Sequence, residues 1–322
     1  MTVTTPAQAG APETVGETTV GETPADPQRE PQPARPGTTR GLPSLGPEGT
    51  RLLRLLDDTF EGWGTAAGAR PMTMPPLLPA ADLAKLDYYD NFPHQAVVAA
   101  PLDLERRATT PFSADTGCFP SDALEPAALG LPSASCYAVY LDHQGTQVAD
   151  DTLVTICSWC FRKETHYEGM RRQLGFRMRE IVAIGAREHA ETHLADFTAR
   201  IQAFATALDL PLRKEAACDP FFDKGGSKAL LQRLTPVKYE FLYEDLAIAS
   251  VNTHRNFFGD RCDITLESTG GAAFTSCVAF GLERWLSALT RRHGSWESAT
   301  QAVLDANARL RADASGAAGP VI

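Results

Sequence analysis

The segment from Cys160 to Gly185, CFRKETHYEGMRRQLGFRMREIVAIG, decides the predicted fold of this chain. Two arms with strand-like residues flank a polar, glycine-containing middle, which predicts two strands joined by a loop. Side chains alternate between faces along a strand, so paired arms would bring Arg162, Glu164, Phe176 and Glu180 onto one surface. A solvated hairpin face also carries such charges, so the pattern alone leaves both interpretations open.

The chemistry of this residue set suits a nucleoside triphosphate. A guanidinium makes forked, charge-assisted contacts with phosphate oxygens, which is the role expected for Arg162. The Glu164 carboxylate is suited to accept from an adenine amino group, and the Phe176 ring is suited to stack on the base. The chain contains no Gly-x-x-x-x-Gly-Lys-Ser/Thr motif, so ATP would bind by a route other than a P-loop.

Composition limits the function classes. The net charge of the 322 residues is −10, which argues against a general nucleic-acid binder because phosphate neutralisation needs clustered Lys and Arg. No apolar run approaches the roughly 20 residues that span a bilayer, and no secretory signal pattern is present. We therefore expect a cytoplasmic protein without a membrane partner. The seven cysteines predict free thiols or metal ligands rather than a disulfide framework.

The N-terminal 46 residues differ from the rest of the chain. Pro, Thr, Glu and Gly dominate this segment, which contains no aromatic residue and no cysteine. Such a composition cannot bury enough apolar surface to offset chain entropy, so residues 1–46 are predicted to be a disordered tail. A single catalytic domain is predicted over residues 47–322, beginning with a helix in EGTRLLRLLDDTFEGWG, residues 48–64.

Strand and helix patterns follow in mixed order. Apolar residues recur at steps of three and four in residues 187–210, which predicts an amphipathic helix there. Residues 280–292 and 296–312 are predicted to form two further helices. Short β-branched and aromatic runs predict strands within residues 135–143, 152–161, 239–252 and 263–268. The strands come as neighbours rather than in regular β-α-β alternation. This order favours an α+β fold with an antiparallel sheet flanked by helices.

Several of these segments carry a family resemblance. CFRKE, GFRMREIVAIG and CVAFGLERW resemble motifs 2 and 3 of the class II aminoacyl-tRNA synthetases. SCYAVY, DPFF, VKYEF and IASVNTHRNFFGDRCDI narrow the resemblance to the amino acid:[carrier protein] ligases, truncated homologues of zinc-dependent seryl-tRNA synthetases. The resemblance covers residues 70–312 and implies a class II synthetase-like catalytic domain.

The resemblance implies an ATP site. The arginine that binds the α-phosphate corresponds to Arg162, the glutamate that contacts adenine to Glu164, and the aromatic ring under the base to Phe176. The motif 3 arginine over the other face of the base corresponds to Arg284, and Arg162 and Arg284 are the expected catalytic residues. Further ATP neighbours are Arg172, Lys238 and Ser250. Mg²⁺ is expected with ATP, but its ligands are left open because Ala247 stands where many synthetases have a glutamate.

The resemblance also implies one zinc ion per subunit, held by Cys136, Glu180 and Cys277. Three protein ligands leave a fourth position open for substrate, and the family uses it for the α-amino group of a small amino acid, so Glu180 also belongs to the substrate site. Glycine is favoured, with alanine as the alternative. Without the resemblance, each thiol is interpreted as a small buried apolar group. Cys157 and Cys160 lie on opposite faces of a predicted strand, so no disulfide is expected between them.

The expected acceptor is the phosphopantetheine thiol of an acyl carrier protein. A short helix at residues 227–234 is its expected contact, with Lys228 and Arg233 attracting an acidic partner, although an ordinary solvated helix face would look the same. Class II domains pair through motif 1, placed here at residues 118–145, which implies a homodimer. Two alternatives stay open: a seryl-tRNA synthetase-like enzyme, although no tRNA-binding N-terminal domain is evident, and a non-catalytic amino-acid-binding regulator.

Overall fold

The computed structural model describes residues 41–106, 109, 112–223, 225 and 236–317. Most of the segment predicted as a tail, and the predicted carrier-binding helix at 227–234 with Lys228 and Arg233, lie outside the described residues. Residues 41–46, the last six residues of the predicted tail, are described and lie directly before helix α1.

Within the described residues, the central element is a seven-stranded sheet of order β1-β6-β7-β12-β10-β9-β8. Only the β1–β6 pair is parallel and the other neighbours are antiparallel. Its strands are β1 (Arg70–Met72), β6 (Asp151–Phe161), β7 (Gly175–Gly185), β8 (Leu212–Ala217), β9 (Lys238–Tyr243), β10 (Leu246–Arg255) and β12 (Phe274–Gly281). The α+β fold with an antiparallel sheet is therefore confirmed.

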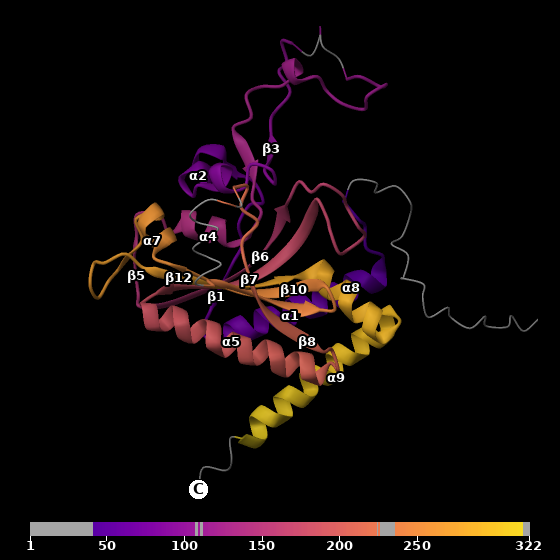
Figure 1. Cartoon of the computed structure of the whole chain (residues 1–322), viewed down its shortest axis with the longest axis vertical. Helices are drawn as coiled ribbons and strands as arrows, with labels where there is room; N and C mark the ends of the chain where they lie inside the picture. The colour runs from indigo at the N-terminus through magenta and orange to yellow at the C-terminus, as the bar shows by residue number, and fades with distance from the viewer. Residues whose placement is uncertain (1–40, 107–108, 110–111, 224, 226–235, 318–322) are drawn as a thin grey trace, which may run out of the picture.

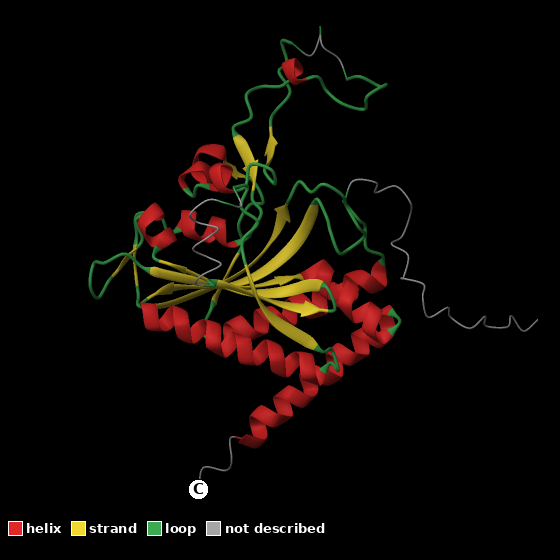
Figure 2. Cartoon of the chain, in the orientation of Figure 1, coloured by secondary structure: helices red, strands yellow, loops and turns green. Residues whose placement is uncertain are grey.

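Long helices cover one face of this sheet (Figures 1 and 2). They are α1 (Pro47–Ala66), α5 (Arg187–Ala207), α8 (Leu282–His293) and α9 (Trp296–Ala317). Their apolar side chains form the main core with the sheet: the Phe60 ring of α1 stacks on Phe280 of β12 at 4.0 Å and lies 5.3 Å from the Trp285 ring of α8. The helices predicted at residues 187–210, 280–292 and 296–312, and the first helix, are confirmed.

Short elements lie on the other face (Figure 1). They are helices α2 (Ala80–Lys85), α3 (Tyr88–Asn91), α4 (Cys136–Asp142) and α7 (Phe257–Cys262), the 3₁₀ helix at Ser121–Ala123, and the short strands β2 (Leu78–Pro79), β3 (Val97–Ala99), β4 (Leu129–Leu131), β5 (Gln147–Val148) and β11 (Thr265–Leu266). Strands β2, β4 and β3 form a small separate sheet. This layer leaves part of the sheet face accessible, and the site lies there.

One local prediction was wrong. Residues 135–143 were predicted as a strand, but Cys136–Asp142 form helix α4. Cys136, Val139 and Tyr140 are spaced for one helix face and all three are buried, so packing outweighs the strand preference of aromatic and β-branched residues. Within the described chain, no helix has the length and apolar character needed to cross a bilayer.

Candidate active site

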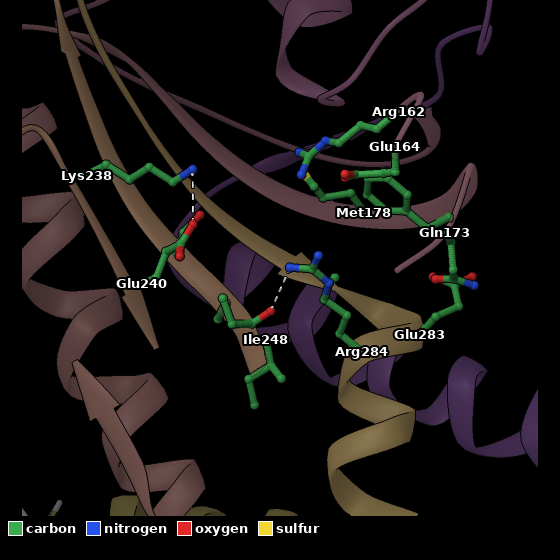
Figure 3. A pocket seen from close by; sticks show the side chains of 14 residues that line it. Arg162, Glu164, Gln173, Met178, Lys238, Glu240, Ile248, Glu283 and Arg284 are labelled. Carbon is green, nitrogen blue, oxygen red and sulfur yellow. Dashed lines mark hydrogen bonds and ion pairs between the residues drawn. The ribbon is translucent and has the colours of Figure 1, made fainter. Parts of the chain in front are cut away.

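A pocket of about 600 Å³, part of it open to solvent, lies on the face of the sheet opposite the long helices. Figure 3 shows side chains from the β6–β7 hairpin, from β9 and β10, and from the start of α8 pointing into it. Its lining includes six of the residues predicted from sequence: Arg162, Glu164, Phe176, Lys238, Ser250 and Arg284. Segments distant in sequence therefore converge on one cavity.

Arg162 and Phe176 form the hairpin side of the pocket. Strand β6 ends at Phe161, and just beyond it the Arg162 guanidinium donates to the carbonyl of Ser133 from Nε at 3.2 Å and from Nη2 at 2.9 Å. The same guanidinium lies 5.0 Å from the centre of the Phe176 ring. A cation and an aromatic ring are thus held side by side, as the pairing of the two arms predicted.

Glu164 and Arg172 face each other in the loop between β6 and β7. Arg172 Nη1 donates to Glu164 Oε2 at 2.7 Å, so the two residues form an ion pair where separate contacts with ATP were expected. The loop is closed by reciprocal backbone hydrogen bonds between Glu168 and Arg172. Glu164 lines the pocket, whereas Arg172 lies behind it and does not belong to the lining.

Arg284 enters the pocket from the first turn of α8. Its Nε donates to the carbonyl of Arg171 at 3.0 Å and its Nη1 to that of Ala247 at 3.1 Å. Burial, and next to it the charge of Arg162, lowers the pKa of Arg284 to about 10. Two partly buried guanidinium groups in one pocket create a positive potential that favours an anionic ligand.

The opposite wall of the pocket carries Lys238 and Ser250. Lys238 Nζ lies 3.3 Å from Asp219 Oδ1 and 3.2 Å from Glu240 Oε1. Burial acts to lower the pKa of Lys238, but the two carboxylates outweigh it and the net shift is upward. Ser250 lies directly opposite Glu240 in the β10–β9 register.

Sequence reasoning missed three polar residues of the pocket: Gln173, Glu240 and Glu283. Glu283 accepts from the Arg177 backbone N–H at 2.8 Å and from its Nε at 3.2 Å, which joins α8 to the start of β7. Glu240 could have been predicted, because alternation along the strand KYEFLY places it on the same face as Lys238. Ala247 lines the pocket and supplies no carboxylate.

A second cluster lies beside the pocket. The donor atoms of Cys136 on α4, Glu180 on β7 and Cys277 on β12 all lie within 4.8 Å of one another, and all three residues are buried. Glu180 Oε1 accepts from the Ser135 N–H at 2.7 Å. Among the described residues, Glu180 Oε2 is a buried oxygen without a hydrogen-bond partner. The three residues predicted as ligands are thus brought together.

This cluster fits a divalent metal ion. Two thiols and a carboxylate are a donor set typical of zinc, and a buried carboxylate oxygen without a partner is costly unless something compensates it. Burial raises the pKa of Glu180. The Cys277 contact, burial and the Glu180 charge raise the pKa of Cys136 well above its usual value. A cation among these groups would reverse both effects because it favours their charged forms.

Comparison with known proteins identifies the family. The chain is 32% identical over 265 residues to amino acid–[acyl-carrier-protein] ligase 1 of Bradyrhizobium diazoefficiens, covering 78% of this chain and 81% of that protein. It belongs to the amino acid–[acyl-carrier-protein] ligase family. Ligase 2 of the same organism is also 32% identical, over 234 residues that cover 69% of this chain and 70% of that protein. No family model matches the chain.

The fold of this ligase is also found in class II aminoacyl-tRNA synthetases. It superposes on M. kandleri SerRS, solved in complex with A. aeolicus tRNASec, with a TM-score of 0.69 and 21% identity over 86% of this chain and 57% of that chain. Prolyl-tRNA synthetase from Cryptosporidium parvum, complexed with halofuginone and AMPPNP, gives a TM-score of 0.61 and 10% identity over 81% and 50% of the two chains. At these identities the likeness concerns the fold, and it confirms the predicted class II architecture.

Polar residues of the ligase surround the thiol–carboxylate cluster. Asn252 Nδ2 lies 3.4 Å from Cys277 Sγ, and His254 Nε2 lies 3.9 Å from the same sulfur. His254 Nδ1 lies 3.3 Å from the Tyr140 hydroxyl oxygen. Asn252 had no separate signal in the sequence, because its importance comes only from lying opposite Cys277 in the β10–β12 register.

The remaining thiols of the ligase lie outside the cluster. Cys157 and Cys160 are free, in agreement with the prediction that their strand positions prevent a disulfide. Cys160 is fully buried, 3.4 Å from Ser135 Oγ, and burial raises its pKa to about 12. In the segment expected to pair two subunits, Cys136, Ala138, Val139 and Tyr140 are buried within one chain.

Proposed function

We propose that this ligase activates a small amino acid with ATP and transfers it to the phosphopantetheine thiol of an acyl carrier protein. One observation carries the proposal: strand β7 contributes Phe176 to the pocket and, four residues later, Glu180 to the thiol–carboxylate cluster. Residues i, i+2 and i+4 share a strand face. A nucleotide at Phe176 and an amino acid at Glu180 would therefore lie side by side on β7.

Activation would join the two substrates in the pocket. A carboxylate oxygen of the amino acid attacks the α-phosphorus of ATP, and pyrophosphate leaves. Arg162 and Arg284 would stabilise the charge that develops on phosphate, so their role is electrostatic and positional. Phe176 and Arg284 would hold the two faces of adenine and Glu164 its amino group, with Arg172, Lys238 and Ser250 as further neighbours. Mg²⁺ would accompany ATP.

One zinc ion per subunit would be held by Cys136, Glu180 and Cys277. When bound, zinc would supply an open coordination position for the α-amino group of the amino acid, which fixes the carboxylate toward ATP. The proposal is supported by the buried donor set and by the unpartnered Glu180 Oε2. A site that holds the amino group beside buried side chains favours glycine, with alanine as the alternative.

Transfer would use a nucleophile supplied by the partner. The phosphopantetheine sulfur attacks the carbonyl carbon of the aminoacyl-adenylate, AMP leaves, and the thiol proton is released. No enzyme cysteine is needed: the buried Cys160 thiol, with a pKa of about 12, is protonated at neutral pH and is a poor nucleophile.

The partner surfaces follow from the same proposal. Lys228 and Arg233, outside the described residues, would attract an acidic carrier protein, and no tRNA would be used. The enzyme would act as a cytoplasmic homodimer. Within residues 118–145, the Phe119 side chain is exposed and would be available to contact a second subunit.

One experiment tests the reaction. Amino-acid-dependent exchange of pyrophosphate into ATP is measured across all 20 amino acids, with zinc quantified in the same preparation, and transfer is then measured to a carrier with and without its phosphopantetheine arm. We expect exchange with glycine, about one zinc per chain, and transfer only to the carrier that has the arm. A variant with Cys277→Ser should lose zinc and exchange together, whereas Cys160→Ser should keep both.

Two results would contradict the proposal. Binding of the amino acid without exchange would indicate a regulator that lacks catalysis. Exchange with serine, followed by transfer to tRNA rather than to the carrier, would indicate a tRNA synthetase.

A further inference from the structure

The six residues before α1, here called the N-terminal strap (residues 41–46), contact the loop that carries Glu164. The Gly41 carbonyl accepts from the Leu174 N–H at 2.8 Å and from the Gly175 N–H at 3.3 Å. On the side of Leu174 that faces away from Gly41, the Leu174 carbonyl accepts from the Arg162 N–H at 2.9 Å. The strap thus extends the β6–β7 hydrogen-bond ladder just beyond the end of β6, and Figure 1 shows it in indigo beside the hairpin loop.

Gly41 has no room for a side chain. Its φ is +73°, and a Cβ atom would lie within 2.4 Å of Tyr167 Cδ1 and 2.5 Å of the Leu174 nitrogen. Glycine is the residue that adopts this backbone conformation without strain. The Tyr167 ring packs over Gly41, and the Tyr167 hydroxyl lies 3.5 Å from the Glu164 nitrogen. The fit between strap and loop therefore depends on the absence of a side chain at residue 41.

Apolar packing adds a second contact. The Leu42 side chain covers Gly175, where a Cβ atom would meet Leu42 Cδ2 at 3.0 Å and Phe161 Cε1 at 3.2 Å. Leu42 is 47% exposed, so this contact contributes little to the main core. The contact packs the strap against Gly175, the first residue of β7.

The residues just before Leu174 lead directly into the pocket. Gln173 lines it, Arg172 pairs with Glu164 at 2.7 Å, and the Arg171 carbonyl holds Arg284 Nε at 3.0 Å. A shift of the Leu174 backbone would displace these three contacts together, because a closed loop transmits a displacement along its backbone.

We propose that Gly41 is a positioning residue for the nucleotide, which acts through Leu174 and the hairpin loop on Glu164, Arg172 and Arg284. The inference rests on the proposed function, because it concerns the site where ATP would bind. It adds that the strap before α1 is part of the catalytic unit. The thiol–carboxylate cluster, on α4, the middle of β7 and β12, has no contact with the strap and should be unaffected.

The test compares full-length Gly41→Ala and Leu42→Ala with a matched control, Gly68→Ala. Gly68 also has a positive φ, +94°, but a Cβ atom there would meet nothing within 4 Å, so this control has the backbone strain without the loop contact. Dissociation constants for AMPPNP, exchange KM values for ATP and for the amino acid, zinc content and amide hydrogen exchange at Leu174 are measured for each. We expect Gly41→Ala to raise both nucleotide constants about tenfold or more, and Leu42→Ala to raise them severalfold.

A change in the nucleotide constants without a change in the KM for the amino acid distinguishes positioning of the nucleotide from general destabilisation of the fold. The KM for the amino acid and the zinc content should stay within about twofold of wild type, while Leu174 exchanges faster in Gly41→Ala and Gly68→Ala resembles wild type. If Gly41→Ala folds and its AMPPNP dissociation constant and KM for ATP are unchanged, the inference is overturned. It is also overturned if Gly41→Ala and Gly68→Ala both raise the KM values for ATP and for the amino acid by the same factor. If Gly41→Ala does not fold, Leu42→Ala decides by the same criteria.

Failure of the proposed function gives a different result. A wild-type chain that binds AMPPNP but supports no exchange would refute the reaction, while nucleotide affinity and Leu174 exchange in the variants would still decide whether the strap positions the loop.

Discussion

The side-chain amide of Asn252 donates to the sulfur of Cys277, with Nδ2 and Sγ 3.4 Å apart on neighbouring strands β10 and β12. The same amide lies 3.1 Å from Ser250 Oγ, a residue of the pocket. Asn252 therefore connects the proposed zinc site with the proposed ATP site. An N–H···S hydrogen bond favours a thiolate over a thiol and fixes the direction of its lone pairs.

Replacing Asn252 by alanine should weaken zinc binding. Loss of such an outer hydrogen bond typically costs about 10- to 100-fold in metal affinity, and we expect a loss in the lower part of that range because Glu180 and Cys136 are retained. Competition with a chromogenic chelator measures the dissociation constant. The control is Asn256→Ala, whose exposed amide binds Asp260; equal affinity in the two variants would show that Asn252 does not support the metal.

Replacing Arg284 by lysine should impair ATP use. Lysine keeps the charge but cannot donate to the carbonyls of Arg171 and Ala247 at once, as the guanidinium does. We expect kcat/KM for ATP in pyrophosphate exchange to fall about 100-fold, with a smaller effect on the KM of the amino acid. Arg291→Lys, at an exposed arginine paired with Glu244, is the matched control. A change of less than about threefold in Arg284→Lys would remove Arg284 from the catalytic residues.

Replacing Arg179 by methionine should destabilise the fold. Arg179 is 4% exposed and binds Asp57 and Glu61 of α1, both at 2.7 Å. Removing it leaves two partly exposed carboxylates without this partner, and losing hydrogen bonds to a charged group costs about 1.5 to 3 kcal/mol. Urea denaturation measures the free energy of unfolding. The exposed pair of Arg187 with Glu191 is the comparison, and Arg187→Ala should give no measurable change; equal stabilities would contradict the assignment.

Acidification should destabilise the protein through His193. Burial, with the nearby His189 adding to it, lowers the pKa of His193 from 6.5 to about 3. Between these values the unfolded chain binds a proton that the folded chain does not, so the stability is fully present above pH 6.5 and falls as the pH decreases. The slope from this residue is about 1.4 kcal/mol per pH unit.

The variant His193→Gln should show a shallower loss of stability between pH 6.5 and 4.5 in urea titrations at fixed ionic strength. Ser276 Oγ donates to the Ala190 carbonyl, so it accepts from His193 Nδ1 at 2.9 Å. Among the described residues His193 Nε2 is a buried nitrogen without a hydrogen-bond partner, so a second proton there would place an unpaired charge in the core. His166→Gln, at an exposed position, is the control, and parallel slopes in both variants would refute the assignment.

The sequence by itself determined the local elements and their chemistry. The alternation in residues 152–161 and 175–185 predicted β6 and β7, and apolar steps of three and four predicted α5, because these periods follow from backbone geometry within one element. The ordered series of motifs around Arg162, Phe176 and Arg284 was sufficient to predict the class II fold and the family. Resemblance, rather than spacing, supplied Cys136, Glu180 and Cys277 as a set.

Only the tertiary structure decided which of these residues meet. Register between β7, β12 and β10 places Glu180, Cys277 and Asn252 around one point, and packing of α4 brings in Cys136 from a segment whose local pattern predicted a strand. Gly41 gained a role because the strap lies against the start of β7, which no pattern near residue 41 encodes. Short-range preferences act over a few residues, whereas these contacts depend on burial of apolar surface shared by the whole sheet.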